Sequence, residues 1–258
     1  MESVEFHTAR ALLEWQIELG ADECISDTPV DRYALPDRLA KPSKPDPKPH
    51  LTRGPVKMAE RDPVAEAQAA ANSADSLDAL RTAMENFELC DLKRGARNMV
   101  FSDGIAGAPV MIIGEAPGRD EDRIGKPFVG ASGALLDKMF GAIGMGRANA
   151  DAPIYITNTL PWRPPHNRDP KPEEIAMMKP FLLRHIALAN PKVVVIMGNW
   201  ACQALLAKRG ITRLRGQWVE AVGKPALPMC HPAYLLRNPE AKRDAWADLL
   251  SLKAAVDK

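Results

Sequence analysis

Short apolar runs that alternate with helical patterns constrain the fold of this chain more than any other feature. The apolar runs cover residues 110–113, 154–157 and 193–197, with a weaker run at 226–229. Helices are predicted over residues 132–143, 172–189, 199–208 and 239–255. This alternation predicts an α/β fold with three α/β/α layers, in which helices cover both faces of a central parallel four-stranded sheet. Pro225 and Pro228 restrict the fourth strand to a short or edge-like pairing.

A long loop rich in glycine and proline, residues 114–133, follows the first apolar run. In open α/β sheets, ligands bind beyond the carboxyl ends of the strands, so we expect the chemistry of this chain at the loop. The loop is not a phosphate-binding P-loop, because six residues separate Gly118 from Gly125 and Pro127 stands where a magnesium-binding Ser or Thr is required. The sequence therefore argues against binding of a nucleoside triphosphate here.

Three motifs follow one another along the chain. Residues 114–130 begin Gly-Glu-Ala-Pro-Gly, continue through an acidic cluster and end Gly-Lys-Pro-Phe-Val-Gly. Ile-Thr-Asn at 156–158 precedes Arg-Pro-Pro-His-Asn-Arg at 163–168, and His-Pro-Ala-Tyr-Leu-Leu-Arg stands at 231–237. In this order the motifs resemble those of the family 4 uracil-DNA glycosylases, over roughly residues 87–253. The resemblance implies a uracil-DNA glycosylase-like fold and hydrolysis of the N-glycosidic bond of uracil in DNA, which leaves an abasic site for base excision repair.

Four residues are the candidates for binding uracil. The resemblance implies that Phe128 stacks on a base flipped out of the duplex, a role that its flat ring suits. Asn158 carries both a donor and an acceptor, which match the O4 and N3–H edge of uracil. Backbone N–H groups at Ala116 and around Gly118 are expected to contact uracil O2. Without the motifs, a Phe beside Val is more typical of a core and an Asn after a strand more typical of a turn.

His231, Glu121 and Glu115 are the candidate catalytic residues. By resemblance, His231 donates to uracil O2 and stabilises the negative charge that develops there. Glu121 matches a functional acidic position of the family and is expected to position water or stabilise the cationic sugar, with Glu115 as the second candidate. Ala116 stands where the best-known uracil glycosylases place a water-activating Asp, so general-base catalysis from that position is excluded. The alternative function is a non-catalytic binder of uracil-containing or abasic DNA.

Binding to DNA requires a local group of cations, because the net charge is only +1. The basic run at residues 208–215 contains Arg213 and Arg215, and Arg237 ends the third motif. For any of these taken alone, a solvated basic surface is as good an interpretation as phosphate contact. Leu235 is the predicted apolar wedge that replaces the flipped base, with a place in the core as its competing role.

The cysteines argue against a metal centre. They stand at positions 24, 90, 202 and 230, far apart and without a Cys-x-x-Cys pair. Family 4 members typically hold a 4Fe-4S cluster with four Cys, and the matching positions here are Phe87, Cys90, Trp162 and Met178. A single thiolate does not hold such a cluster, so we expect no iron-sulfur cluster and no metal. The large apolar replacements predict a core that fills the space, with the cysteines at 90, 202 and 230 buried.

Composition divides the chain into three predicted segments. These are an N-terminal helical segment at 1–35, a flexible linker rich in Pro and Lys at 36–63, and a uracil-DNA glycosylase-like domain at 64–258. Helical patterns occur at 8–19 and at 64–89. No apolar stretch approaches a membrane span and no signal-peptide pattern begins the chain, so we expect a cytoplasmic protein without a membrane partner. The expected partners are uracil-containing DNA and its abasic product, and the protein is expected to be monomeric.

Overall fold

The computed structural model of the chain describes residues 4–18 and 62–257. In the first of these parts, Val4–Glu18 form helix α1, which confirms that a helix stands near the N-terminus. The predicted linker at 36–63 lies outside the described residues except for its last two positions. The predicted segment at 1–35 is described only over α1. All other elements belong to residues 62–257.

A six-stranded sheet forms the centre of residues 62–257, in the order β1-β3-β2-β4-β6-β5. Short antiparallel strands, β1 (Asp103–Gly104) and β5 (Val219–Ala221), form its edges. The prediction of four strands is therefore wrong in number, because edge strands this short do not show as apolar runs. It is correct for the centre, where four strands run parallel: β3 (Ile154–Asn158), β2 (Val110–Gly114), β4 (Val193–Met197) and β6 (Lys224–Met229).

Strand β6 is more central than its prolines suggested. It pairs with β4 on one side and with β5 on the other, so the edge-like pairing predicted for it is wrong. Its pairing with β5 ends at Ala226, and Pro228 lies beyond that point, so the missing N–H of Pro228 leaves no gap in the β5 ladder. The third motif therefore leaves the sheet at Met229, next to the end of β4.

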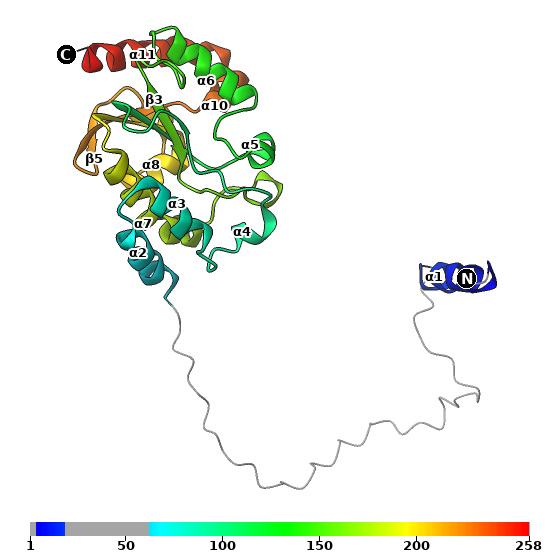
Figure 1. Cartoon of the computed structure of the whole chain (residues 1–258). Helices are drawn as coiled ribbons and strands as arrows, with labels where there is room; N and C mark the ends of the chain where they lie inside the picture. Colours follow the sequence, from blue (N-terminus) through cyan, green and yellow to red (C-terminus); the bar gives the residue numbers. More distant parts are fainter. Residues whose placement is uncertain (1–3, 19–61, 258) are drawn as a thin grey trace, which may run out of the picture. The chain divides into compact units, whose positions relative to one another are not determined.

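Helices cover both faces of the sheet, as predicted (Figure 1). One face carries α6 (Ala131–Gly141), α10 (Pro232–Arg237) and α11 (Lys242–Val256). The other carries α7 (Pro172–Ala189) and α8 (Asn199–Leu206), with α2 (Pro63–Ser73) and α3 (Leu77–Glu85) packed on α7. The shorter elements are α4 (Leu92–Gly95), α5 (Arg119–Ile124), α9 (Ile211–Leu214) and the 3-10 turns η1 (Pro165–Asn167) and η2 (Pro239–Ala241).

The helical pattern at 64–89 forms two helices rather than one. Ala74 is extended and ends α2, and Ser76 begins α3 by accepting a hydrogen bond from the N–H of Ala79 at 3.2 Å. These helices enclose a cluster of buried side chains that is separate from the main core around the sheet. We call it the second core, and its members include Phe87, Cys90, Trp162, Met178 and Phe181.

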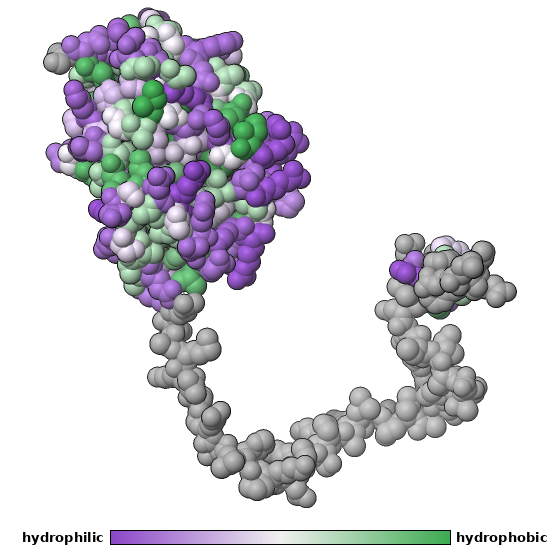
Figure 2. Space-filling model, viewed as in Figure 1, coloured by the Kyte–Doolittle hydropathy of each residue, from purple (hydrophilic) through white to green (hydrophobic). Residues whose placement is uncertain are grey.

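The surface of residues 62–257 offers no broad apolar area on the face shown in Figure 2, where hydrophobic residues form separate spots among hydrophilic ones. The exposed large hydrophobic side chains of this part are also scattered along the chain, at Val64, Ile105, Ile124, Trp218, Val222, Leu236, Trp246 and Leu250. Within the described residues, no helix has the length and apolar character needed to cross a bilayer.

Candidate active site

The carboxyl ends of β2, β3 and β6 meet at one rim of the sheet and surround a hollow of about 370 Å³, which we call the first hollow. Glu115 follows β2, Asn158 ends β3 and His231 follows β6, so the fold gathers three distant chain segments at one site. The other predicted site residues that line it are Ala116, Gly118, Glu121, Phe128 and Arg237.

Phe128 lines the first hollow from a strained backbone. Its φ is +53°, in the left-handed region that residues with side chains rarely adopt. The ring lies against Gly114, where a Cβ atom would stand 2.6 Å from the ring and 2.4 Å from Asn158 Oδ1. A Cβ atom on Gly133 would lie 1.8 Å from the Phe128 carbonyl oxygen. The two glycines therefore allow the ring and the Asn158 amide to meet at the end of β2.

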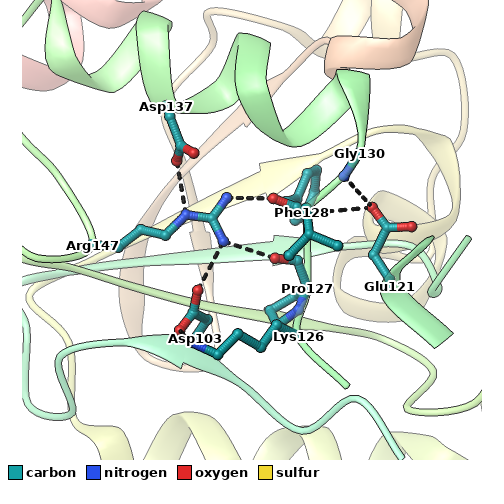
Figure 3. A network of polar contacts seen from close by, with 9 residues as sticks. Asp103, Glu121, Lys126, Pro127, Phe128, Gly130, Asp137 and Arg147 are labelled. Atoms are coloured by element: carbon teal, nitrogen blue, oxygen red, sulfur yellow. Dashed lines mark hydrogen bonds and ion pairs between the residues drawn. The ribbon is translucent and has the colours of Figure 1, made fainter. Parts of the chain in front are cut away.

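Arg147 holds this strained loop in place (Figure 3). Its guanidinium donates hydrogen bonds to the carbonyl oxygens of Pro127 at 2.8 Å and Phe128 at 2.5 Å. The same group pairs with Asp103 at 3.0 Å and with Asp137 at 2.7 Å, which fixes its orientation. Sequence reasoning missed Arg147, because it lies outside all three motifs and an arginine that binds the carbonyl groups of a distant loop has no sequence signature.

Glu121 secures the other side of the same loop. Its Oε2 accepts a hydrogen bond from the N–H of Gly118 at 3.1 Å, and its Oε1 accepts from Val129 at 3.2 Å and Gly130 at 3.4 Å. Both carboxylate oxygens thus accept from the backbone of the loop, and the role in handling water or sugar charge stays a prediction. The Gly118 N–H is engaged as well, which leaves the Ala116 N–H as the candidate backbone donor of this turn.

His231 presents a neutral imidazole to the first hollow. Its Nδ1 accepts a hydrogen bond from the N–H of Ala233 at 3.1 Å, which assigns the ring proton to Nε2. Burial lowers the pKa of His231 to about 4, and the positive charge of Arg237 adds to the shift. The ring stacks beside Phe128, with 5.2 Å between ring centres. Gly198, which follows β4, makes room for it, because a Cβ atom there would lie 3.3 Å from His231 Cβ.

Glu115 and Asn158 complete the polar wall of the first hollow. Asn158 is only 7% exposed, so its amide is presented with little competing water. Burial raises the pKa of Glu115 to about 7, with the negative charge of Asp169 adding to the shift and the positive charge of Arg209 opposing it. A carboxyl group that changes charge near neutral pH beside a hollow is typical of a functional site.

The predicted DNA-binding arginines differ in their surroundings. Arg237 is exposed and lines the first hollow, and Arg213 is exposed on α9. Arg215 instead pairs with Asp248, with 2.9 Å between Nε and Oδ2, and lies 3.7 Å from Asp244. Because Asp248 is buried, Arg215 is committed to the interior of the domain.

Leu235, the predicted wedge, has no exposed surface in this structure. Its side chain belongs to the main core and lines an apolar hollow between α6 and α11 with residues such as Met139 and Trp246. The next residue, Leu236, is 44% exposed. The fold thus gives Leu235 the competing role, a place in the core, while Leu236 is the apolar side chain of this motif that reaches solvent.

The four positions that match cluster ligands lie in the second core, where Phe87 is 6%, Cys90 1%, Trp162 2% and Met178 1% exposed. Burial raises the pKa of the Cys90 thiol to about 11, so this group is protonated at neutral pH. Three apolar side chains and one protonated thiol do not fit an iron-sulfur cluster. Cys202 and Cys230 are buried, as predicted. Among the described residues, no group of three or more His, Cys, Asp or Glu side chains is arranged to hold a metal ion.

Comparison with known proteins agrees with this geometry. Residues 101–250 match the family model of the uracil DNA glycosylase superfamily. The chain is 38% identical over 183 residues to the type-4 uracil-DNA glycosylase of Archaeoglobus fulgidus, which covers 67% of this chain and 90% of that protein. It is 37% identical over 174 residues to the type-4 enzyme of Thermotoga maritima, which covers 66% of this chain and 88% of the relative. This chain therefore belongs to the uracil DNA glycosylase superfamily.

Proposed function

We propose that this chain is a monofunctional uracil-DNA glycosylase, which hydrolyses the N-glycosidic bond of uracil in DNA and leaves an abasic site. One observation carries the proposal: the neutral His231 imidazole, the Asn158 amide and the Phe128 ring line a single hollow of about 370 Å³. The type-4 uracil-DNA glycosylases that the chain resembles support the same substrate.

Base recognition uses the ring and the amide. A uracil flipped out of the stack lies against Phe128, and its Watson–Crick edge meets Asn158. The amide oxygen accepts from uracil N3–H, and the amide nitrogen donates to O4. Arg147 and Glu121 act as positioning residues in this scheme, because their contacts fix the loop that carries Phe128.

Bond cleavage separates a uracil anion from an oxocarbenium-like sugar, so stabilisation of both charges replaces the need for a strong nucleophile. His231 donates its Nε2–H to uracil O2, where negative charge develops, and the Ala116 N–H is a second donor to the same oxygen. The ionised carboxylate of Glu115 lies on the same wall and stabilises the cationic sugar. Water then adds to the cationic sugar and loses one proton, which passes to solvent or to the uracil anion.

Contacts to the DNA backbone come from the exposed arginines in this proposal. Arg237 lies at the first hollow and Arg213 is exposed, so both are suited to phosphate, whereas Arg215 is committed to Asp248. We propose Leu236 as the wedge in place of Leu235, because Leu235 would have to leave the main core to enter a duplex. The partners are uracil-containing DNA and the abasic product, bound by a monomer in the cytoplasm.

We also propose that the chain works without an iron-sulfur cluster, which the filling of the second core supports. The purified protein should be colourless, and elemental analysis should find no stoichiometric iron; about four irons per chain would contradict this.

The segments 1–35, 36–63 and 64–258 are proposed on composition. Limited proteolysis should cut within 36–63 and leave 64–258 intact.

Single-turnover release of uracil tests the function directly. A labelled single-stranded oligonucleotide with one uracil should lose that base and become sensitive to alkaline cleavage, while the same strand with thymine should stay intact. A protein that binds the uracil strand without releasing the base would be the non-catalytic binder, and the proposal of an enzyme would be wrong.

A further inference from the structure

A second hollow of about 380 Å³ adjoins the first at the same rim of the sheet. The two share part of their walls, including Glu115, His231 and Arg237. The second hollow also has walls of its own, from Trp200 at the start of α8 and from Tyr234 on α10. The proposed cleavage uses only the first hollow, which leaves the second without an assigned ligand.

The second hollow has the aromatic character that stacks nucleobases. Trp200 is partly buried against the main core, and the guanidinium of Arg209 lies over its ring, 3.6 Å from the ring centre. This stacking orders both planar groups. Indole rings and guanidinium planes are the surfaces on which unpaired bases stack in complexes with single strands.

The charges around the second hollow favour a base over a phosphate inside it. Glu115 and Asp169 both line it, and carboxylates repel a phosphate. Arg237 lies on the shared wall of the two hollows, where a phosphate that links two neighbouring nucleotides would pass. A neutral base in the second hollow therefore avoids repulsion by the two carboxylates, and a phosphate at Arg237 is attracted by its guanidinium.

We propose that the second hollow binds the base of a nucleotide adjacent to the uracil, stacked on the Trp200 ring that Arg209 holds in place, with Arg237 contacting the phosphate between them. This inference rests on the proposed function, because it takes the first hollow to hold uracil. The protein then reads a uracil together with one neighbour, and an isolated deoxyuridine should be a poor substrate.

Binding to single strands that carry a non-hydrolysable 2′-fluoro-deoxyuridine tests the proposal. In two of the strands, the base on one side of the uracil is replaced by an abasic tetrahydrofuran. For the unchanged protein, loss of the base on one side should weaken binding about 5- to 100-fold, as expected for a lost stacking contact, with little effect on the other side. Trp200→Leu keeps the apolar bulk and should reduce that difference to below about 2-fold.

Two further variants keep the test decisive. Trp200→Phe retains an aromatic face and should keep most of the one-sided effect. Trp218→Leu is the matched control, since Trp218 is 38% exposed, donates its ring N–H to Ser251 at 2.8 Å and does not line the second hollow. If Trp200→Leu does not fold, Arg209→Ala at an exposed position should at least halve the one-sided effect.

The inference is overturned if the unchanged protein binds all the strands equally, or if Trp200→Leu folds and retains the full one-sided loss. Because these strands are not cleaved, the result of the binding test does not depend on the result of the uracil-release assay that tests the proposed function. A protein that shows the one-sided stacking effect but releases no uracil from ordinary strands contradicts only the enzymatic activity.

Discussion

The rim of the sheet keeps the polar side chains typical of family 4, whereas the second core lacks most of the cysteines that family 4 members use as cluster ligands. At the rim, Glu115, Asn158 and His231 supply the polar groups that the family pattern leads one to expect. In the second core, three of the four positions that match cluster ligands carry apolar side chains no more than 6% exposed. Groups that hydrogen-bond a substrate have no apolar substitute, whereas a cluster that supports a core can be replaced by side chains that fill the same space.

The two regions also differ in how their backbone is held. The rim contains Phe128 at φ +53°, a conformation that costs free energy and persists because Arg147 and Glu121 bind the loop from both sides. The second core contains ordinary helices, with Phe87 packed edge-on to Phe181 at 5.3 Å between ring centres. No buried member of the second core has a positive φ, so in this comparison the strained backbone lies at the rim, where the proposed chemistry takes place.

The largest effect on uracil release is expected from His231→Ala and Asn158→Ala. Each removes one hydrogen-bonding group that acts on the leaving base, a loss that typically lowers the rate by about 10²- to 10³-fold. Single-turnover release measures this, and circular dichroism should show that both variants remain folded. If neither loss reached about threefold, the rim would not be the active site and its contrast with the second core would disappear.

Arg147→Ala should have the next largest effect, roughly 10- to 100-fold in kcat/KM, because small displacements of a positioning loop are costly. Lys126→Ala is the matched control: Lys126 is exposed and pairs with Asp103 at 3.2 Å, but its ammonium contacts neither loop carbonyl. In a Phe128→Ala background, Arg147→Ala should add little, since both changes act on the same ring. Fully additive effects would show that Arg147 acts on stability rather than through Phe128.

The sequence predicted which side chains lie at the rim better than it predicted the contacts that hold them there. Phe128, Asn158 and His231 lie in contiguous motifs, and the alternation of apolar runs implied that the ends of their strands share one rim. Arg147 was missed because its partners are backbone carbonyls, which any sequence provides. The burial of Leu235 and the Arg215–Asp248 pair depend on how α10 and α11 pack, and local patterns do not encode that packing.

The pH dependence of uracil release should depend on Glu115. Its carboxyl has a pKa of about 7 and acts in its ionised form, so kcat/KM should rise as the pH increases through about 7 and level off above. His231, with a pKa of about 4, stays neutral over this range and adds no step there. Glu115→Gln should remove the step and lower the plateau. A step that persisted in Glu115→Gln would belong to another group.

Arg213 and Arg215 differ in a similar way, and the expected effects are smaller. The side chain of Arg213 is exposed, whereas that of Arg215 is paired with the buried Asp248. Arg213→Ala should reduce the magnitude of the log K against log salt slope for duplex DNA by about 1. Arg215→Ala should leave that slope nearly unchanged and lower the melting temperature, because it leaves the buried carboxylate of Asp248 unpaired. The reverse pattern would make Arg215 the phosphate contact.

The smallest effect on uracil release is expected from Trp162→Ala in the second core. Loss of this buried ring should lower the free energy of unfolding by about 3–5 kcal/mol, measured by urea titration, because it leaves a cavity among Phe87, Met178 and their neighbours. The release rate of the folded fraction, measured at low temperature, should stay near that of the unchanged protein. If the alanine variant does not fold, Trp162→Phe, which removes less buried volume, is measured in its place. Phe128→Ala is the counterpart at the rim: its ring is 5% exposed and belongs to the main core, so a similar loss of stability is expected, but together with a large loss of release. A tenfold slower release in folded Trp162→Ala would mean that the second core sets the geometry of the rim, and that the two regions are coupled rather than separable.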